Sequence, residues 1–295
     1  MPIIQGFEYY KPTSASEVLK ILSKYKNPAI LAGGTDLINN LKTETDQPDA
    51  VVDIKGIKTL RGIALKNGVL TIGAAVTFSD LIDSKIINTK FPVIAEVART
   101  VGSVGVRNRA TMIGNICSAV ACADSSPLLI AYEATVVVQE KKGKRKIPVE
   151  KWFKGNKRTA IKKNEMVIAV EIPLPAKKYA GCFVKMGRYS GEDLAQASVL
   201  ILALPENRYR VAFGAVGPVP VRAKKLESLL NGHEVSDDLI AKSKKIIPTI
   251  ISPITDIRAS KEYRLHMCQV MFERGLKAAV SRSKGNGPAY GHSLI

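Results

Sequence analysis

The sequence predicts an α+β protein made of two small subdomains followed by a third α+β domain. Three observations support this fold class. Short apolar runs enclose a helical pattern between residues 29 and 54, a two-residue hairpin signal lies at Asn67-Gly68, and strand-like segments followed by helical patterns fill residues 183–282. We expect boundaries that divide the chain into residues 1–57, 58–176 and 177–284, with residues 285–295 as a flexible tail.

The first part has the pattern of a β-α-β unit. Ser14 and Glu17 have the spacing of a capping box at the start of a helix. The other elements expected here are strands at residues 7–10, 29–32 and 51–54 and a short helix at residues 37–41. A loop therefore lies at the carboxyl end of the second strand, where α/β folds tend to bind ligands.

This loop, residues 32–37 (AGGTDL), combines two glycines, a hydroxyl and a carboxylate. Gly33 and Gly34 allow backbone N–H groups to approach a ligand without a Cβ atom in the way, and a helix that starts behind them favours negative charge. The pattern predicts a phosphate or pyrophosphate site, with an ordinary Gly-Gly turn as the alternative.

The second part begins with a hairpin, because Asn67-Gly68 separates two apolar segments. Thr77 is expected to cap a helix through Leu81, and Ser126-Pro127 to start another with proline at its first position. Further elements expected are helices at residues 92–98 and 128–131 and strands at residues 62–65, 69–72, 135–139 and 167–172.

Residues 102–118 of the second part are rich in small and polar side chains, and we expect a loop at residues 111–115 to face the first loop. Pro173 and Pro175 mark the end of this part. In the third part we expect three antiparallel strands, at residues 183–186, 197–204 and 209–216, and helices at residues 223–230, 236–247 and 260–282.

The charge balance is strongly basic, with 44 Lys and Arg residues against 26 Asp and Glu residues and a net charge of +18. Such a charge suits a nucleic acid, an anionic ligand or acidic partner subunits. No nucleic-acid reader motif or aromatic platform accompanies it, and the basic cluster at residues 141–146 fits the solvated tip of a hairpin, so we expect no nucleic-acid binding.

Cysteines and histidines give no metal-binding pattern. Cys117 and Cys122 have half of an iron–sulfur spacing but no third cysteine nearby, and the three histidines lack ligand spacing. The four cysteines fit free thiols. With no signal peptide and no long apolar run, we expect a cytoplasmic protein without a membrane span.

Five stretches together resemble one family, the FAD-binding (medium) subunit of molybdenum hydroxylases, which includes the corresponding chains of carbon monoxide dehydrogenase and xanthine dehydrogenase. They are residues 32–37 (AGGTDL), 106–116 (VRNRATMIGNI), 124–127 (Asp-Ser-Ser-Pro), 183–195 (FVKMGRYSGEDLA) and 256–264 (DIRASKEYR). The resemblance covers nearly the whole chain. It implies a two-subdomain FAD-binding domain of the vanillyl-alcohol-oxidase (PCMH) type followed by the C-terminal α+β domain. The absence of a G-x-G-x-x-G motif agrees that this is not a Rossmann fold.

The resemblance also implies which residues bind FAD. The first loop would place backbone N–H groups at the pyrophosphate, and Thr111 and Asn115 of the second would add side-chain donors. Asp124 would accept hydrogen bonds from cofactor hydroxyls, with helix capping as its alternative role, and Lys185 would lie near the isoalloxazine, with an exposed strand lysine as its alternative. The full set is Ile30, Leu31, Ala32, Gly33, Gly34, Thr35, Asp36, Leu37, Val101, Thr111, Met112, Ile113, Gly114, Asn115, Asp124, Val167 and Lys185, with no catalytic and no metal-binding residue.

One position departs from the family pattern. The second loop usually reads T-x-G-G-N, and here Ile113 replaces the first glycine. Because a β-branched residue does not easily adopt a positive φ, Ile113 either has an ordinary backbone conformation or reshapes the loop. Arg188, Glu192 and Asp193 lie near the expected lysine, and we assign them no role.

The function implied by the resemblance is electron transfer. A large subunit with the molybdenum cofactor would oxidise the substrate, a small subunit with [2Fe-2S] clusters would pass on the electrons, and FAD in this chain would deliver them to NAD⁺ or another acceptor. A hetero-oligomer, a dimer of heterotrimers, is expected. The alternatives are a self-contained flavin oxidoreductase of the same fold and a non-catalytic basic binding protein.

Overall fold

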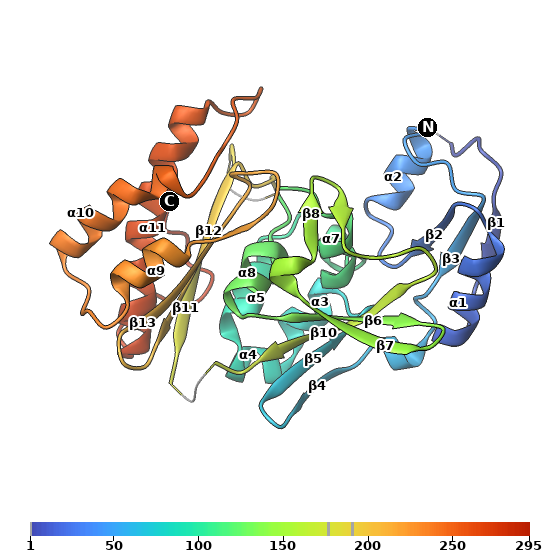
Figure 1. Cartoon of the computed structure of the whole chain (residues 1–295), viewed down its shortest axis with the longest axis horizontal. Coiled ribbons are helices and arrows are strands. Elements are labelled where there is room, and N and C mark those ends of the chain that lie inside the picture. Colours follow the sequence, from blue (N-terminus) through green and yellow to red (C-terminus); the bar gives the residue numbers. More distant parts are fainter. Residues whose placement is uncertain (1, 176–177, 190–191) are drawn as a thin grey trace.

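The computed structural model describes residues 2–175, 178–189 and 192–295 and arranges them as three larger β-sheets in a row, each with its own helices (Figure 1). The first sheet is parallel, with the order β1-β3-β2. Its elements are β1 (Glu8–Tyr10), α1 (Ala15–Lys24), β2 (Pro28–Leu31), α2 (Leu37–Lys42) and β3 (Ala50–Asp53). The predicted β-α-β unit is thus present, and the Ser14 side chain caps α1 by accepting a hydrogen bond from the Glu17 N–H.

The second sheet is antiparallel, with the order β4-β5-β10-β6-β7. Its strands are β4 (Ile63–Lys66), β5 (Val69–Gly73), β6 (Thr135–Glu140), β7 (Gly143–Pro148) and β10 (Met166–Pro173). Asn67 and Gly68 both have positive φ values, 50° and 74°, as a two-residue hairpin turn requires. A further small sheet has two strands, β8 (Phe153–Gly155) and β9 (Arg158–Thr159).

The helices that accompany the second sheet are α3 (Phe78–Asp83), α4 (Lys85–Lys90), α5 (Pro92–Arg99), α6 (Val104–Arg107), α7 (Met112–Ser118) and α8 (Ser125–Ala131). Thr77 caps α3 as predicted, in a capping box with Asp80. Single helical turns of the 3₁₀ type occur at η1 (Lys58–Leu60), η2 (Val149–Lys151) and η3 (Ile247–Thr249).

Three local predictions for this part were wrong in detail. The segment at residues 111–115 is not a loop, because Thr111 caps α7 and the next residues form its first turn. Pro127 is the third residue of α8 rather than the first, a position where its missing N–H still costs no helical hydrogen bond. The basic cluster at 141–146 extends from the hairpin tip into β7 instead of forming the tip alone.

The third sheet is antiparallel, with the order β11-β12-β13-β14. Its strands are β11 (Ala180–Met186), β12 (Ala197–Leu204), β13 (Arg208–Gly214) and β14 (Val221–Arg222), and its helices are α9 (Lys224–Leu230), α10 (Asp237–Ile246) and α11 (Lys261–Ser283). The fold class is confirmed, but the short strand β14 makes this sheet four-stranded where we predicted three strands. The predicted boundary between residues 176 and 177 lies outside the described residues.

The third sheet is buried on both faces, which fixes the C-terminal domain against the second subdomain. Leu200 and Leu202 of β12 belong to the large core around the second sheet, whereas Val199 and Ile201 pack into a separate core with α11. Alternate residues of a strand point to opposite faces, so one strand contributes to two cores. Burial on both faces explains why residues 197–204 are apolar almost without interruption.

Within the described residues, no helix is long and apolar enough to cross a membrane. The terminal segment, which we expected to be flexible, contacts the body of the protein: Arg282 donates hydrogen bonds to the carbonyls of Pro288 and Ala289, and Gly291 donates its N–H to Glu96.

Trp152 connects α7 to the rest of the second subdomain. Its side chain is fully buried, and its indole N–H donates a 2.9 Å hydrogen bond to the carbonyl of Ile116. Ile116 lies in the last turn of α7, where carbonyls have no donor within the helix. The indole therefore satisfies an otherwise unpaired buried acceptor and holds α7 in place.

We expect Trp152→Phe to lower the free energy of unfolding by about 2–4 kcal/mol, because it removes buried volume and leaves the Ile116 carbonyl without a donor. Urea unfolding followed by circular dichroism measures this loss. Lys151→Ala, at the exposed neighbouring residue, is the control and should change stability by less than about 0.5 kcal/mol. Equal urea midpoints for the wild type and Trp152→Phe would contradict the prediction.

Candidate functional site

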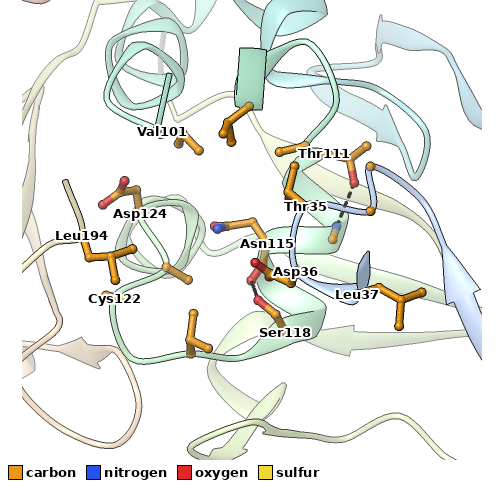
Figure 2. A pocket seen from close by; sticks show the side chains of 18 of the residues that line it. Thr35, Asp36, Leu37, Val101, Thr111, Asn115, Ser118, Cys122, Asp124 and Leu194 are labelled. Carbon is orange, nitrogen blue, oxygen red and sulfur yellow. Dashed lines mark hydrogen bonds between the residues drawn. The ribbon is translucent and has the colours of Figure 1, made fainter. Parts of the chain in front are cut away.

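A cavity of about 650 Å³ lies where the three parts of the chain meet. The loop after β2 lines one side of it, and Leu194 of the C-terminal domain lies on the opposite side (Figure 2). Residues between α5 and α8 and Lys185 of the C-terminal domain also line it. The two segments predicted to face each other, residues 32–37 and 111–115, both border it.

At Gly33 the first loop comes very close to Arg109 and Ala110, which directly precede the second segment. A Cβ atom on Gly33 would lie 2.3 Å from the carbonyl oxygen of Arg109 and 2.7 Å from the Cα of Ala110, so only glycine fits here. Gly34 has a φ of +79°, a conformation that glycine adopts without strain. The two glycines therefore have different tasks, because the first allows close packing and the second turns the chain toward α2.

The backbone N–H groups of this loop are available to a ligand. No hydrogen bond between described residues uses the N–H of Gly33, Gly34, Thr35 or Asp36 as a donor, whereas the Gly34 carbonyl accepts from Ile38 at the start of α2. Consecutive N–H groups without an internal acceptor beside a cavity suit the oxygens of a phosphate or pyrophosphate.

The second segment presents polar groups from one side of α7 to the same cavity. Thr111 Oγ1 accepts a 2.9 Å hydrogen bond from the Gly114 N–H, so the hydroxyl hydrogen remains available for donation. Asn115 Oδ1 accepts from the Ser125 N–H at 3.2 Å, which fixes the amide and leaves its NH₂ group for the cavity (Figure 2). Both side chains are therefore held as donors.

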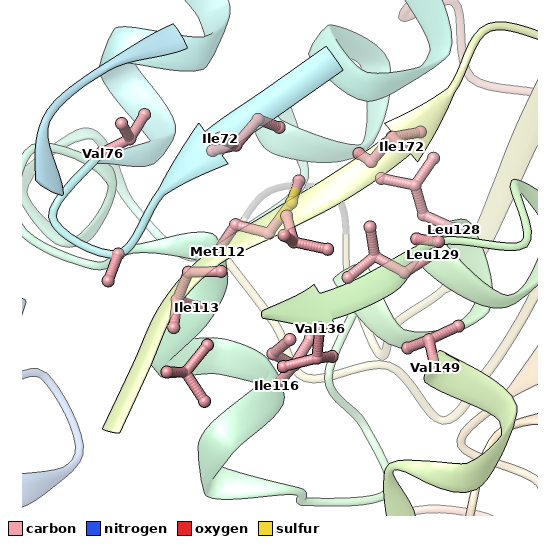
Figure 3. Packing of buried hydrophobic residues seen from close by; sticks show 14 of the residues in the cluster. Ile72, Val76, Met112, Ile113, Ile116, Leu128, Leu129, Val136, Val149 and Ile172 are labelled. Atoms are coloured by element: carbon pink, nitrogen blue, oxygen red, sulfur yellow. The ribbon is translucent and has the colours of Figure 1, made fainter. Parts of the chain in front are cut away.

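Ile113 has an ordinary helical conformation. It is the second residue of α7, its φ is not positive, and its side chain is buried in the large core with Met112 and Ile116 (Figure 3). Of the two possibilities at this position, an ordinary backbone is therefore the one that occurs.

At the other end of the cavity, Asp124 and Lys185 form a buried ion pair. Lys185 Nζ lies 2.7 Å from Asp124 Oδ2 and donates a second hydrogen bond, of 2.8 Å, to the carbonyl of Thr100. The two side chains are only 6% and 10% exposed. Asp124 stands at the N-cap position of α8 but makes no capping hydrogen bond, so the alternative role as a helix cap is not supported.

Burial raises the pKa of Asp124 to about 6, although the charge and hydrogen bond of Lys185 act in the opposite direction. The second oxygen of this carboxyl, Oδ1, is buried and has no hydrogen-bond partner among the described residues. A buried acceptor without a donor is costly, so this oxygen is suited to a ligand hydroxyl that reaches into the cavity.

Most of the predicted site residues line this one cavity. The exceptions are Leu31, Met112, Ile113 and Val167, whose side chains are buried in apolar cores. A role for these four would have to use backbone atoms, and it stays a prediction.

Sequence reasoning missed several lining residues, among them Gly102, Ser103, Ser118, Cys122, Leu194 and Arg258. A usable signal was present for one of them. Thr111, Gly114, Asn115 and Ser118 recur at helical spacing and share one side of α7, while Met112, Ile113 and Ile116 face the core. Small polar residues on that face would have predicted a helix bordering a site.

Comparisons with known proteins agree with this architecture. Residues 5–175 match the family described as "FAD binding domain in molybdopterin dehydrogenase", and residues 206–279 match "CO dehydrogenase flavoprotein C-terminal domain". The carbon monoxide dehydrogenase medium chain of Hydrogenophaga pseudoflava is 30% identical over 94% of this chain and 98% of its own length. The solved structure of carbon monoxide dehydrogenase from the same organism has a chain that superposes with a TM-score of 0.91, at 30% identity over 96% of this chain and 99% of the other.

Two further relatives have different named activities. The putative xanthine dehydrogenase FAD-binding subunit of Escherichia coli K12 is 28% identical over 94% of this chain and 97% of its own length. The glyceraldehyde dehydrogenase medium chain of Sulfolobus acidocaldarius is 31% identical over 92% of this chain and 97% of its own length. The architecture described here is thus shared by chains whose names refer to different substrates.

The raised pKa of Asp124 predicts a specific pH dependence of stability. The folded protein binds this proton up to about pH 6, whereas an unfolded chain releases it near pH 4. The folded state therefore holds more protons in this window, and stability falls as the pH rises through it. In the chain without ligand, we expect the stability of the wild type relative to Asp124→Asn to fall by about 2–3 kcal/mol between pH 4 and pH 7.

Unfolding by urea at several pH values measures this difference. Asp53→Asn is a useful contrast, because hydrogen bonds from Lys55 and Tyr9 outweigh the effect of burial and lower the pKa of Asp53. The stability of the wild type relative to Asp53→Asn should therefore rise, rather than fall, as the pH rises. If the free energies of unfolding of the wild type and Asp124→Asn changed in parallel with pH, the pKa of Asp124 would not be raised by folding.

Proposed function

The chain belongs to the family of FAD-binding subunits of molybdenum hydroxylases, and from this premise we propose that it is the FAD-carrying electron-transfer subunit of such an enzyme. Electrons would arrive from the iron–sulfur clusters of a small subunit, after a large molybdenum-cofactor subunit has oxidised the substrate. FAD would pass them to NAD⁺ or another acceptor. The single observation that carries this proposal is the cavity bordered by the glycine loop, α7 and the Asp124–Lys185 pair.

The polar groups of the cavity fit a dinucleotide. The N–H groups of residues 33–36 would bind the pyrophosphate, and Thr111 and Asn115 would donate from the other side. The unpartnered Oδ1 of Asp124 would accept a hydrogen bond from a sugar or ribityl hydroxyl. The fit supports FAD over FMN, since a single phosphate would leave one of the two donor segments unused.

FAD supplies the redox chemistry when it is bound, and the protein controls its surroundings. Lys185 would hold a positive charge beside the isoalloxazine, where it favours the reduced, anionic form. Thr100 and Asp124 fix the ammonium in place through their hydrogen bonds. No described side chain needs to transfer a proton in this scheme, and the absence of a catalytic residue stays a prediction.

The proposal places the other redox centres in partner subunits. Among the described residues, no group of three or more His, Cys, Asp or Glu side chains could hold a metal ion. The net charge of +18 would favour association with acidic partners and would orient them through long-range attraction. A dimer of heterotrimers in the cytoplasm remains our proposal for the assembly.

The decisive experiment compares the chain alone with the assembled enzyme. We expect the isolated chain to bind FAD but to show no flavin reduction by aldehydes, purines or carbon monoxide, because the substrate site lies in another subunit. Adding the molybdenum and iron–sulfur subunits should restore reduction by one of these substrates, and more slowly at high salt. Reduction by the isolated chain at the rate of the complex would favour a self-contained flavoenzyme. A colourless chain that binds polyanions would favour a basic binding protein.

A second prediction tests the site itself. Gly33→Ala should abolish FAD retention, because its Cβ atom would meet the Arg109 carbonyl and push the first loop away from the second segment. Gly62→Ala is the matched control, since a Cβ atom there meets nothing within 4 Å. Acid release and chromatography of the cofactor measure retention and distinguish FAD from FMN. If Gly33→Ala kept a full complement of FAD, the first loop would not be the pyrophosphate site.

A further inference from the structure

Glu96 is a buried carboxylate that the proposed function does not use. It lies in α5, is 3% exposed and accepts hydrogen bonds from several sides. Phe183 donates its backbone N–H at 2.9 Å, Gly291 donates its N–H at 2.9 Å, and the Arg282 guanidinium donates through both terminal nitrogens at 2.9 and 3.2 Å. Because the hydrogen bonds of this buried carboxylate are satisfied, Glu96 holds the residues that donate to it in one arrangement.

The partners of Glu96 come from elements that are far apart in the sequence. Phe183 lies on β11, the edge strand of the third sheet, where its N–H faces away from β12. Arg282 of α11 also donates to the carbonyl of Gly181 on the same edge, at 2.8 Å. The Glu96–Arg282 pair therefore covers the free edge of β11 and joins α5, β11 and α11.

Lys185 links two of the elements that Glu96 connects, β11 and α5. It follows Phe183 by two residues on β11, so both side chains point toward the second subdomain. Its ammonium donates to the carbonyl of Thr100, which ends α5 one turn after Glu96. This hydrogen bond thus links β11 to the end of α5, and Glu96 fixes the distance between these two elements.

The C-terminal segment completes the surroundings of Glu96. Arg282 binds the carbonyls of Pro288 and Ala289, its guanidinium lies 4.1 Å from the centre of the Tyr290 ring, and Gly291 binds Glu96 directly. A second cavity of about 520 Å³ is lined by Glu96, Thr100, Lys185 and Gly291 together. The segment at 288–291 and the lysine are therefore parts of one contiguous arrangement.

We infer that Glu96 is the positioning residue for Lys185, and that through Glu96 the C-terminal segment at 288–291 takes part in setting the potential of the cofactor. The inference rests on the proposed function, because it requires a flavin beside Lys185. Glu96 itself does not touch the cofactor cavity. Its effect is transmitted through the relative position of α5 and β11, which sets where the ammonium lies.

The test measures the midpoint potential of bound FAD in the purified full chain. Glu96→Gln keeps the shape of the side chain but removes the charge that orders Arg282 and the two backbone donors. We expect the displaced ammonium to favour reduced flavin less, with about a tenfold change in the ratio of reduced to oxidised flavin, equal to about 30 mV for a two-electron couple. The FAD content should stay at that of the wild type.

Glu227→Gln is the matched control. Glu227 is also a buried carboxylate that accepts a strand N–H, from Val211 at 2.8 Å, and pairs with an arginine, Arg222, yet it borders none of the cavities described here. The Glu227→Gln variant should lower the free energy of unfolding, as Glu96→Gln does, but should leave the midpoint potential of FAD unchanged. Equal shifts in both variants would overturn the inference, because a general loss of packing would then explain them.

The Lys185→Met background shows whether Glu96 acts through the lysine. If it does, Glu96→Gln should cause no further shift once the ammonium is gone, whereas an additive shift would overturn the inference. Should Glu96→Gln fail to fold, deletion of residues 288–295 removes the Gly291 and Tyr290 contacts and should shift the potential in the same direction. An unchanged potential in the deletion would overturn the inference, while absence of FAD from the wild-type chain would contradict the proposed function instead.

Discussion

The buried ion pair between Asp124 and Lys185 is the constraint on which the arrangement of the site depends. It joins the FAD-binding half to the C-terminal domain at 2.7 Å, with both side chains almost fully removed from water. Desolvation of two charges is offset only when further hydrogen bonds satisfy them. Lys185 has such a bond to Thr100, but one oxygen of Asp124 has none among the described residues. The pair is thus positioned in advance, and one carboxylate oxygen is left for a ligand to bind.

Burial of the third sheet on both faces explains how this pair is held. Odd-numbered residues of β11, such as Phe183, face the second subdomain, while Cys182 and Val184 face α11. Lys185 lies two residues after Phe183 on the same face of the strand, so its side chain is directed toward Asp124. A shift of the register by one residue would turn the lysine into the other core, and the apolar neighbours on both sides make such a shift costly.

Local features were predictable from the sequence, and long-range pairings were not. The Asn67-Gly68 hairpin, the Thr77 cap and the glycine loop follow from rules that act within a few residues. Helix α7 has only seven residues and several small side chains, so its pattern was mistaken for a loop. The contact of Lys185 with Asp124 spans 61 positions and that of Arg282 with Glu96 spans 186, and no short motif encodes either.

The isoleucine at position 113 shows why a departure from a motif has to be judged in its structural setting. The resemblance led us to expect glycine there, and a β-branched residue raised the question of backbone strain. In α7 this position has helical dihedral angles, and its side chain enters the large core rather than the cavity. Helical φ values suit isoleucine, and burying its side chain contributes about 1.5–3 kcal/mol. The polar face formed by Thr111, Gly114 and Asn115 is unaffected, since it lies on the other side of the helix. The substitution therefore changes how α7 is anchored and leaves the donors of the site in place.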